Sequence, residues 1–452
     1  MKTKMSLMML LLAALVMVSC EPINEPTTEN GGTTSLDDSN IASVNKVTNF
    51  YGTIYEVILK DGNRMYFGIK NDSEVRMGDW SYFYDGSEYE YEKYAAYEYK
   101  GDLVIPEKIT LEGKEYTVTE LYDMSQSASS SKSGGSNDYR YWEETYKTPN
   151  TTLLSVVIPN TIKKMISGCF GGCTSLKSVT FAKGSPIKEL VGSCFLGCSS
   201  LEDVVLPENI TTIGDRTFAF CTSLKTIILP KSITTIAGEA FYGCTALENI
   251  NLENVTVIGD AFIDYGVFTG CTSLKTVNLE SAVAIHQHVF YRCTSLENVK
   301  LDNLEVLGSA AFDSCTALKK VELPSIKYLG VDVDEDHDEI FWSTGDAFVD
   351  CHALETLILG NSLIKTHQYE LFEGCENLKD VYCYAVNPPI PLDWEEGDYD
   401  YREFIGDFVL YVPAGSIEAY KETRWGEIYQ LREDDDDWYE SAGERTIVAI
   451  EE

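Results

Sequence analysis

The chain has 452 residues, with 72 acidic and 35 basic side chains and a formal net charge of −37. So large an anionic excess, without a long lysine or arginine run, excludes general binding to nucleic-acid phosphates. Hydrophobic residues make up 44% and charged residues 24% of the chain, which is the composition of a globular protein. Thirteen cysteines, an odd number, leave disulfide, metal and repeat explanations open.

The chain begins with the pattern of an export signal. Lys2 and Lys4 precede an uncharged, apolar-biased run over residues 5–18. This run is shorter than the roughly 20 residues that a membrane-spanning helix needs. We therefore predict a signal peptide over residues 1–19.

The residues after the apolar run point to a lipid anchor. Met17-Val-Ser-Cys20 resembles a bacterial lipobox, and this resemblance implies diacylation of Cys20. An ordinary signal peptide with a chance cysteine is the alternative. The polar, Pro-, Gly- and Thr-rich sequence that follows predicts a flexible tether over 20–49. We expect a protein anchored by lipid in the bacterial outer membrane and exposed at the cell surface.

Residues 50–123 are predicted to form a β-rich N-terminal cap. Ile54–Leu59 and Met65–Ile69 flank an Asp61-Gly62 turn, which is typical of a β-hairpin. Tyrosine and tryptophan then recur, partly with period two, and we expect them to seal the first repeat. The alternative is a ligand platform, because rigid rings with polar tips serve carbohydrate and protein sites. Its candidate residues are Trp80, Tyr82, Tyr84, Tyr89 and Tyr91.

A Ser- and Tyr-rich insertion over 124–150 separates this cap from a repeated sequence. The pattern Phe-x-x-Cys-x-x-Leu-x-x-[Val/Ile/Leu]-x-[Leu/Phe/Cys] recurs, with one unit of about 23 residues. In Leu224–Pro230, the apolar residues Leu224, Ile227 and Leu229 suit a short strand that faces a core and ends at the proline. The repeat cysteines are Cys173, Cys198, Cys221, Cys244, Cys271, Cys293, Cys315, Cys351 and Cys375.

The segment Ile213–Leu224, with the pattern Ile-Gly-x-x-[Ala/Thr]-Phe-x-x-Cys-x-[Ser/Ala]-Leu, resembles the BspA-like leucine-rich repeats of bacterial surface proteins. The resemblance extends over about residues 98–425. It implies a β-rich solenoid, a right-handed leucine-rich-repeat coil of about nine 23-residue repeats over 151–383. It also implies a β-hairpin N-terminal cap, a short strand-helix C-terminal cap over 384–426, and a role in adhesion.

The closing segments are expected to be a cap and a tail. Phe408–Val412 has the pattern of a strand, and Ser416–Trp425 that of a short helix with Ser416 as its N-cap. Residues 427–452 are predicted to be a solvated acidic tail. Residues 331–340 carry an acidic loop that lacks the glycine of an EF-hand, so a solvated loop is favoured over a cation site.

Two rows of equivalent residues follow from the repeat. The nine cysteines are expected to fill one small buried slot, with a disulfide as the alternative and no metal. The residue after each repeat's first leucine alternates in sign, which predicts a self-neutralising ladder rather than a charged binding strip. That row is Lys177, Glu202, Lys225, Glu248, Lys275, Glu297, Lys319, Glu355 and Lys379.

The sequence carries no recognised catalytic motif: it has no G-x-S-x-G, no phosphate-binding glycine loop and no H-E-x-x-H. The pair His286 and His288 is interpreted as two ordinary surface residues. We predict a noncatalytic monomer without cofactor or nucleic-acid partner that binds an unknown protein or glycan. The alternative is a glycan-capture accessory or an enzyme that uses the aromatic N-terminal region.

Overall fold

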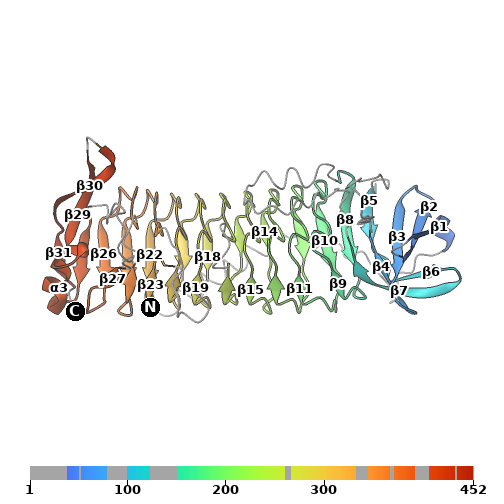
Figure 1. The fold of residues 1–452 in the computed structure, drawn as a ribbon, viewed down its shortest axis with the longest axis horizontal. Helices are drawn as coiled ribbons and strands as arrows, with labels where there is room; N and C mark the ends of the chain where they lie inside the picture. Colours follow the sequence, from blue (N-terminus) through green and yellow to red (C-terminus); the bar gives the residue numbers. More distant parts are fainter. Residues whose placement is uncertain are drawn as a thin grey trace, which may run out of the picture.

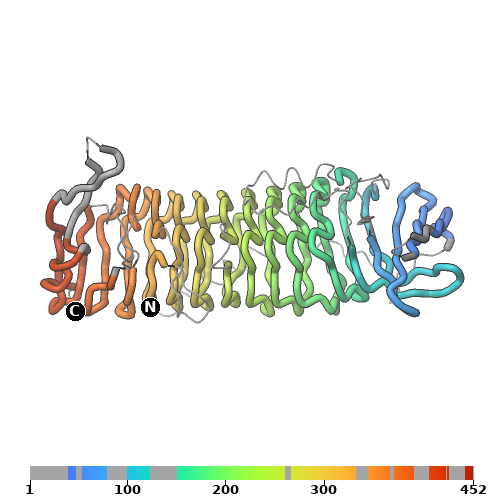
Figure 2. Tube along the Cα trace, viewed as in Figure 1, coloured from blue at the N-terminus to red at the C-terminus, as the bar shows by residue number. Residues whose placement is uncertain are grey.

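In a computed structural model the chain forms a long rod of stacked coils, with a separate sheet at its N-terminal end (Figure 1). The structure describes residues 38–49, 52–78, 99–122, 150–259, 266–331, 345–366, 371–391, 407–432 and 435–450. Successive coils run parallel to one another along the rod (Figure 2). The predicted leucine-rich-repeat solenoid is therefore confirmed.

The N-terminal sheet has the strand order β1-β2-β3-β4-β7-β6. Its predicted hairpin is the antiparallel pair β2–β3, joined through Asp61 and Gly62. A short strand of the first coil, β9, pairs with β7 and connects this sheet to the solenoid. The strands are β1 (Ile41–Asn49), β2 (Gly52–Leu59), β3 (Arg64–Ile69), β4 (Glu74–Met77), β6 (Lys108–Leu111), β7 (Lys114–Leu121) and β9 (Lys164–Met165).

The flexible tether predicted over 20–49 is wrong at its C-terminal end. Asp38–Asn40 form a 3₁₀ turn, η1, and Ile41–Asn49 form β1, which pairs with β2 except at a bulge between Ile41 and Ser43. Residues 42–46 are exposed, so backbone hydrogen bonds rather than apolar burial hold this edge strand in place. A strand of this kind has the polar composition of a linker.

Each solenoid coil gives strands to two surfaces of the rod. We call the outer side of the first set the leucine face, because its strands follow the repeat's first leucine. These strands are β5 (Gly101–Val104), β8 (Leu153–Ile158), β10 (Ser178–Phe181), β12 (Asp203–Val205), β14 (Thr226–Ile227), β16 (Asn249–Ile250), β18 (Thr276–Asn278), β20 (Asn298–Lys300), β22 (Lys320–Leu323), β24 (Thr356–Leu359), β26 (Asp380–Cys383) and β28 (Val409–Val412).

We call the outer side of the second set the isoleucine face. It is one parallel sheet of nine two-residue strands. They are β11 (Glu189–Leu190), β13 (Thr212–Ile213), β15 (Thr235–Ile236), β17 (Val257–Ile258), β19 (Ala284–Ile285), β21 (Val306–Leu307), β23 (Tyr328–Leu329), β25 (Lys365–Thr366) and β27 (Ile390–Pro391).

The core lies between the two faces. Leu224, Ile227 and Leu229 point inward and are almost fully buried, as their alternation predicts. The repeat phenylalanines are buried and stack in one column, with neighbouring ring centroids 5.3–6.2 Å apart. They are Phe170, Phe195, Phe218, Phe241, Phe268, Phe290, Phe312, Phe348 and Phe372.

The alternating charged row runs along the leucine face. Backbone hydrogen bonds place its members on neighbouring coils, as between Glu248 N and Lys225 O at 2.8 Å. Among the described residues of the row, Lys275–Glu248 at 3.6 Å and Lys379–Glu355 at 3.4 Å are ion pairs. Their side chains are about half exposed, so each pair contributes roughly 0–1 kcal/mol at most.

The acidic tail predicted over 427–452 is also wrong. Glu427–Arg432 (β29) and Asp435–Glu444 (β30) form an antiparallel hairpin, and Ile447–Ala449 (β31) pairs in parallel with β28. The β28 edge is thereby covered. Acidic composition indicated solvation, whereas the backbone of this segment completes a sheet.

Arg445 seals the same end of the rod. It is only 4% exposed, and its guanidinium carbon lies 3.6 Å from the centroid of the Phe408 ring. Nε donates to Trp425 O at 3.2 Å, and one Nη donates to Phe408 O at 3.4 Å. Burial lowers the pKa of Arg445 to about 10, so the group stays charged at neutral pH. The C-terminal segment is a structural part of the rod.

The C-terminal helix differs in detail from the prediction. Ala414–Ser416 (η2) and Arg424–Gly426 (η3) are 3₁₀ turns around the short helix α3 (Ile417–Lys421). The Ser416 side chain does not cap this helix, because its hydroxyl donates to Val386 O at 2.6 Å. Across the described ranges, no helix is both long and apolar enough to span a membrane.

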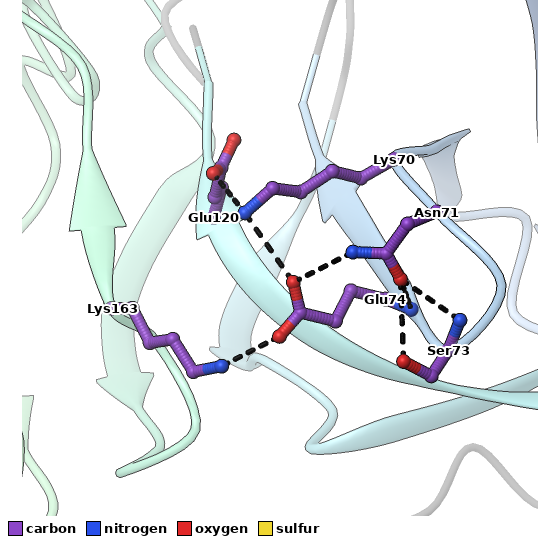
Figure 3. A network of polar contacts seen from close by, with 6 residues as sticks. All are labelled: Lys70, Asn71, Ser73, Glu74, Glu120 and Lys163. Carbon is purple, nitrogen blue, oxygen red and sulfur yellow. Dashed lines mark hydrogen bonds and ion pairs between the residues drawn. The ribbon is translucent and has the colours of Figure 1, made fainter.

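An ionic network fixes the N-terminal sheet against the first coil (Figure 3). The Glu74 carboxylate accepts hydrogen bonds from Lys163 Nζ at 2.5 Å and from Asn71 Nδ2 at 3.1 Å. Lys70 Nζ lies 2.5 Å from Glu120 Oε1 and 3.4 Å from Glu74 Oε2. Because Lys163 belongs to the first coil and Glu74 to the sheet, the network joins the two parts.

Replacing Glu74 by glutamine should reduce the acid sensitivity of the protein. The hydrogen bond from Lys163 is the largest cause that lowers the pKa of Glu74 from 4.5 to about 2. A lowered carboxyl pKa stabilises the folded state above its unfolded value, and this stabilisation is lost as pH falls from 4.5 towards 2. Urea-unfolding midpoints should therefore fall less steeply below pH 4.5 in Glu74→Gln and in Lys163→Met. Profiles identical to that of the unsubstituted chain would contradict this.

Candidate binding surfaces

The leucine face carries a row of exposed apolar side chains near the N-terminal end of the solenoid. Strand alternation turns Ile227 inward, whereas the next residue, Ile228, points outward and is 76% exposed. Val104 and Val205 occupy the same outward position on other strands, and each is nearly half exposed. The register runs Val104, Val157, Thr180, Val205 across the sheet. Equivalent positions on adjacent strands thus make one row that is apolar except at Thr180.

The C-terminal end of the leucine face carries tyrosines. Tyr382 on β26 and Tyr411 on β28 are register partners whose rings stack with centroids 4.4 Å apart. Alternation beyond β26 also turns Tyr384 outward, and it is 42% exposed. We did not predict this group from the sequence, although the pattern Asp-Val-Tyr-Cys-Tyr over 380–384 contains the signal.

The predicted aromatic platform, Trp80, Tyr82, Tyr84, Tyr89 and Tyr91, lies outside the described residues, as does the lipidation candidate Cys20.

The residues that flank the platform segment are described. Tyr122 N donates to Met77 O at 2.7 Å, and Thr152 Oγ1 donates to Tyr99 O at 2.8 Å. The described residues just before segments 79–98 and 123–149 are therefore neighbours, and so are the described residues just after them. The acidic loop likewise lies outside the described residues, except for the buried Val331.

The nine repeat cysteines occupy one equivalent, buried position. From the second repeat onward, each thiol donates to the backbone carbonyl of the phenylalanine one coil earlier, as Cys271 Sγ does to Phe241 O at 3.2 Å. No disulfide joins the cysteines in the part of the chain that the structure describes. The other bonds of this series run from Cys198, Cys221, Cys244, Cys293, Cys315, Cys351 and Cys375.

These thiols should resist alkylation in the folded protein. Burial raises the pKa of Cys244 and of Cys375 to about 12, so little thiolate forms at pH 8. Iodoacetamide treatment followed by mass spectrometry should find the repeat cysteines unmodified in native protein and fully modified in guanidinium chloride. Modification of native protein at the denatured rate would show that the slot is open.

His286 and His288 belong to neither surface row. The His288 ring packs edge-on against Tyr291, with centroids 5.5 Å apart. Across the described residues, no group of three or more histidine, cysteine, aspartate or glutamate side chains is arranged to hold a metal ion.

Comparison with known proteins agrees with this architecture. The chain matches the model of one protein family, the BspA type leucine rich repeat region. Six copies match over residues 144–266, 261–333 and 342–387, which is more than half of the chain. No curated protein matches.

Several solved structures resemble the chain. A leucine-rich repeat protein from Bacteroides ovatus is 17% identical, with 86% of this chain and 98% of that chain covered and a TM-score of 0.46. A leucine rich cell surface protein from Faecalibacterium prausnitzii is 21% identical over 70% of this chain and 92% of its own, with a TM-score of 0.32. The T. pallidum leucine rich repeat protein is 20% identical over 56% and 86%, with a TM-score of 0.34. The repeats, the parallel-stranded coils and the family match together establish that this chain belongs to the BspA-type leucine-rich-repeat proteins.

Proposed function

We propose that the protein is a noncatalytic scaffold, anchored by a lipid on Cys20 in the outer membrane, that binds a protein or glycan partner in adhesion at the cell surface. The apolar row formed by Val104, Val205 and Ile228 carries this proposal. Single exposed apolar residues are common, but contiguous ones mark interaction sites. A solenoid extends such a row over several coils.

The test compares two faces of one rod. Purified protein is applied to arrays of matrix proteins and glycans, and retained binding is measured for Val205→Asp/Ile228→Asp. The matched control is Val257→Asp/Val283→Asp. These two valines are 47% and 41% exposed, and they do not belong to the apolar row of the leucine face. We expect roughly tenfold weaker binding in the first variant alone, equal to about 1.4 kcal/mol. Equal loss in both, or none in either, would exclude the apolar row as the binding site.

The anchor and the exposure are tested on cells. Palmitate labelling should be lost in Cys20→Ser, and protease added to intact cells should cleave the unsubstituted protein. Retained label in Cys20→Ser would contradict the lipid anchor. Complete protection from protease would place the rod on the periplasmic side of the outer membrane.

A glycan-capture accessory remains a second proposal. It is supported by the contacts between the residues that flank segments 79–98 and 123–149, since both segments contain several aromatic side chains. Loss of glycan binding in Tyr82→Ser/Tyr89→Ser, with Val205→Asp/Ile228→Asp unaffected, would support it over the first proposal.

A further inference from the structure

We propose that the C-terminal end of the leucine face binds an arginine-bearing, basic polypeptide segment of a partner. The inference rests on the proposed function, because it assigns one partner class to one part of the scaffold. The site is the tyrosine patch, which we define as Ile358, Tyr382, Tyr384, Tyr411 and Val448, together with the carboxylate of Asp380.

The patch is one line of side chains across four strands. Register pairs join Ile358 to Tyr382, Tyr382 to Tyr411, and Tyr411 to Val448, on β24, β26, β28 and β31 in turn. Three strand spacings make this line about 14 Å long. Val448, at one end of the line, is 37% exposed, and Tyr384, two residues beyond Tyr382, is 42% exposed, so the patch is accessible at these two residues. The last member of the line, Val448, lies on the C-terminal strand β31, which the acidic composition of residues 427–452 did not predict.

Asp380 gives the patch its charge. It lies two residues before Tyr382 on the same side of β26. The neighbouring Asp380 carboxylate is the largest cause that raises the pKa of Tyr411. The carboxylate is therefore held beside the rings while it remains partly accessible.

A guanidinium group suits both components. It is planar, it stacks on aromatic side chains, and it pairs with a carboxylate through two donors. The C-terminal part of the sequence adds long-range attraction, because residues 384–452 carry 19 acidic and 5 basic side chains. An excess of this sign raises the local concentration of cationic partners and speeds their association. Charge complementarity thus selects a basic segment.

The ring arrangement disfavours a sugar. Carbohydrates stack on an exposed flat ring face. Tyr382 and Tyr411 are nearly parallel, with an interplanar angle of 10°, so each covers one face of the other. The exposed Tyr384 ring and the Asp380 carboxylate remain for a guanidinium group, which needs one ring face and one carboxylate.

The experiment uses the full chain and a labelled peptide of alternating arginine and serine, with binding followed by fluorescence anisotropy at low salt. The site variants are Asp380→Asn, Tyr411→Ser and the more exposed Tyr384→Ser. The control Asp203→Asn changes net charge by the same amount at the equivalent outward position of β12. Val257→Ser on the isoleucine face, where Val257 is 47% exposed, is the control for the tyrosines. We expect binding about fivefold weaker in each site variant and unchanged in both controls.

Three results would overturn the inference. Equal weakening by Asp380→Asn and Asp203→Asn would reduce the effect to bulk charge. Binding of a neutral glucose hexasaccharide, lost in Tyr384→Ser, without arginine-peptide binding would make the patch a glycan site. Partner capture on the arrays that depends on Val205 and Ile228 but not on Asp380 would remove this inference and leave the proposed function in place. If the arrays detect no binding that depends on Val205, Ile228 or Asp380, while the peptide still binds in a way that depends on Asp380, the proposed function fails and this inference stands.

Discussion

Truncation after Glu444 should unravel the C-terminal end of the rod. The truncation removes Arg445 and β31, so the Phe408 ring loses its cation and the β28 backbone loses Thr446 O as an acceptor for Leu410 N. A desolvated cation–π contact is worth about 2 kcal/mol, and each lost hydrogen bond about 1 kcal/mol. We expect a loss of roughly 3–5 kcal/mol from the local free energy of unfolding.

Hydrogen exchange measures this loss where it occurs. Because each coil of a solenoid contacts only its neighbours, amide protection should fall in β28 and β26 and stay unchanged near β13. Removing only Glu451 and Glu452 is the control, since it takes away two acidic groups and leaves β31 in place. The single substitution Arg445→Gln separates the cation from the strand and should reproduce about half of the effect. Full protection of β28 in the truncated chain would mean that the segment is a tail after all.

The repeat was predictable because every coil solves the same packing problem. Positions such as Leu224, Ile227 and Leu229 recur once in every repeat. The spacing of apolar residues in the sequence is therefore the spacing of buried side chains in the core. The thiol at Cys244 likewise recurs, because its carbonyl acceptor recurs one coil earlier. Periodicity therefore gave the solenoid, its two inward-facing strand sets and the buried cysteine slot.

The edge strands were not predictable for the opposite reason. β1 and β31 are held by pairing with β2 and β28, and backbone groups are the same in every residue. β1 mixes apolar and polar side chains without a clear alternation, and β31 is only three apolar residues, Ile447–Ala449, that follow a strongly acidic stretch. The tyrosine patch was missed because Tyr382 and Tyr411 are 29 residues apart in the sequence, which is longer than the repeat of about 23 residues. Counting by repeat does not align them, whereas strand register does.

Replacing Phe268 by alanine should divide the rod into two weakly coupled halves. Phe268 is fully buried, and its ring stacks at 5.4 Å on both Phe241 and Phe290. Removing a buried phenylalanine side chain costs about 3–5 kcal/mol, and each aromatic contact adds about 0.5–1.5 kcal/mol. Since stability in a solenoid is a sum of coil and nearest-neighbour terms, the loss of two interfaces in mid-rod should turn one thermal transition into two.

The end of the same column supplies the comparison. Phe170 is equally buried but has one stacked neighbour in the column, Phe195 at 5.6 Å. Phe170→Ala should therefore lower Tm less and keep a single transition. Phe268→Leu, which retains most of the apolar volume but loses both ring contacts, should cost about 1–3 kcal/mol. Calorimetry of the three variants measures all of these quantities. Identical Tm losses in Phe170→Ala and Phe268→Ala would show that burial alone, without coupling through the ring column, sets the stability of each coil.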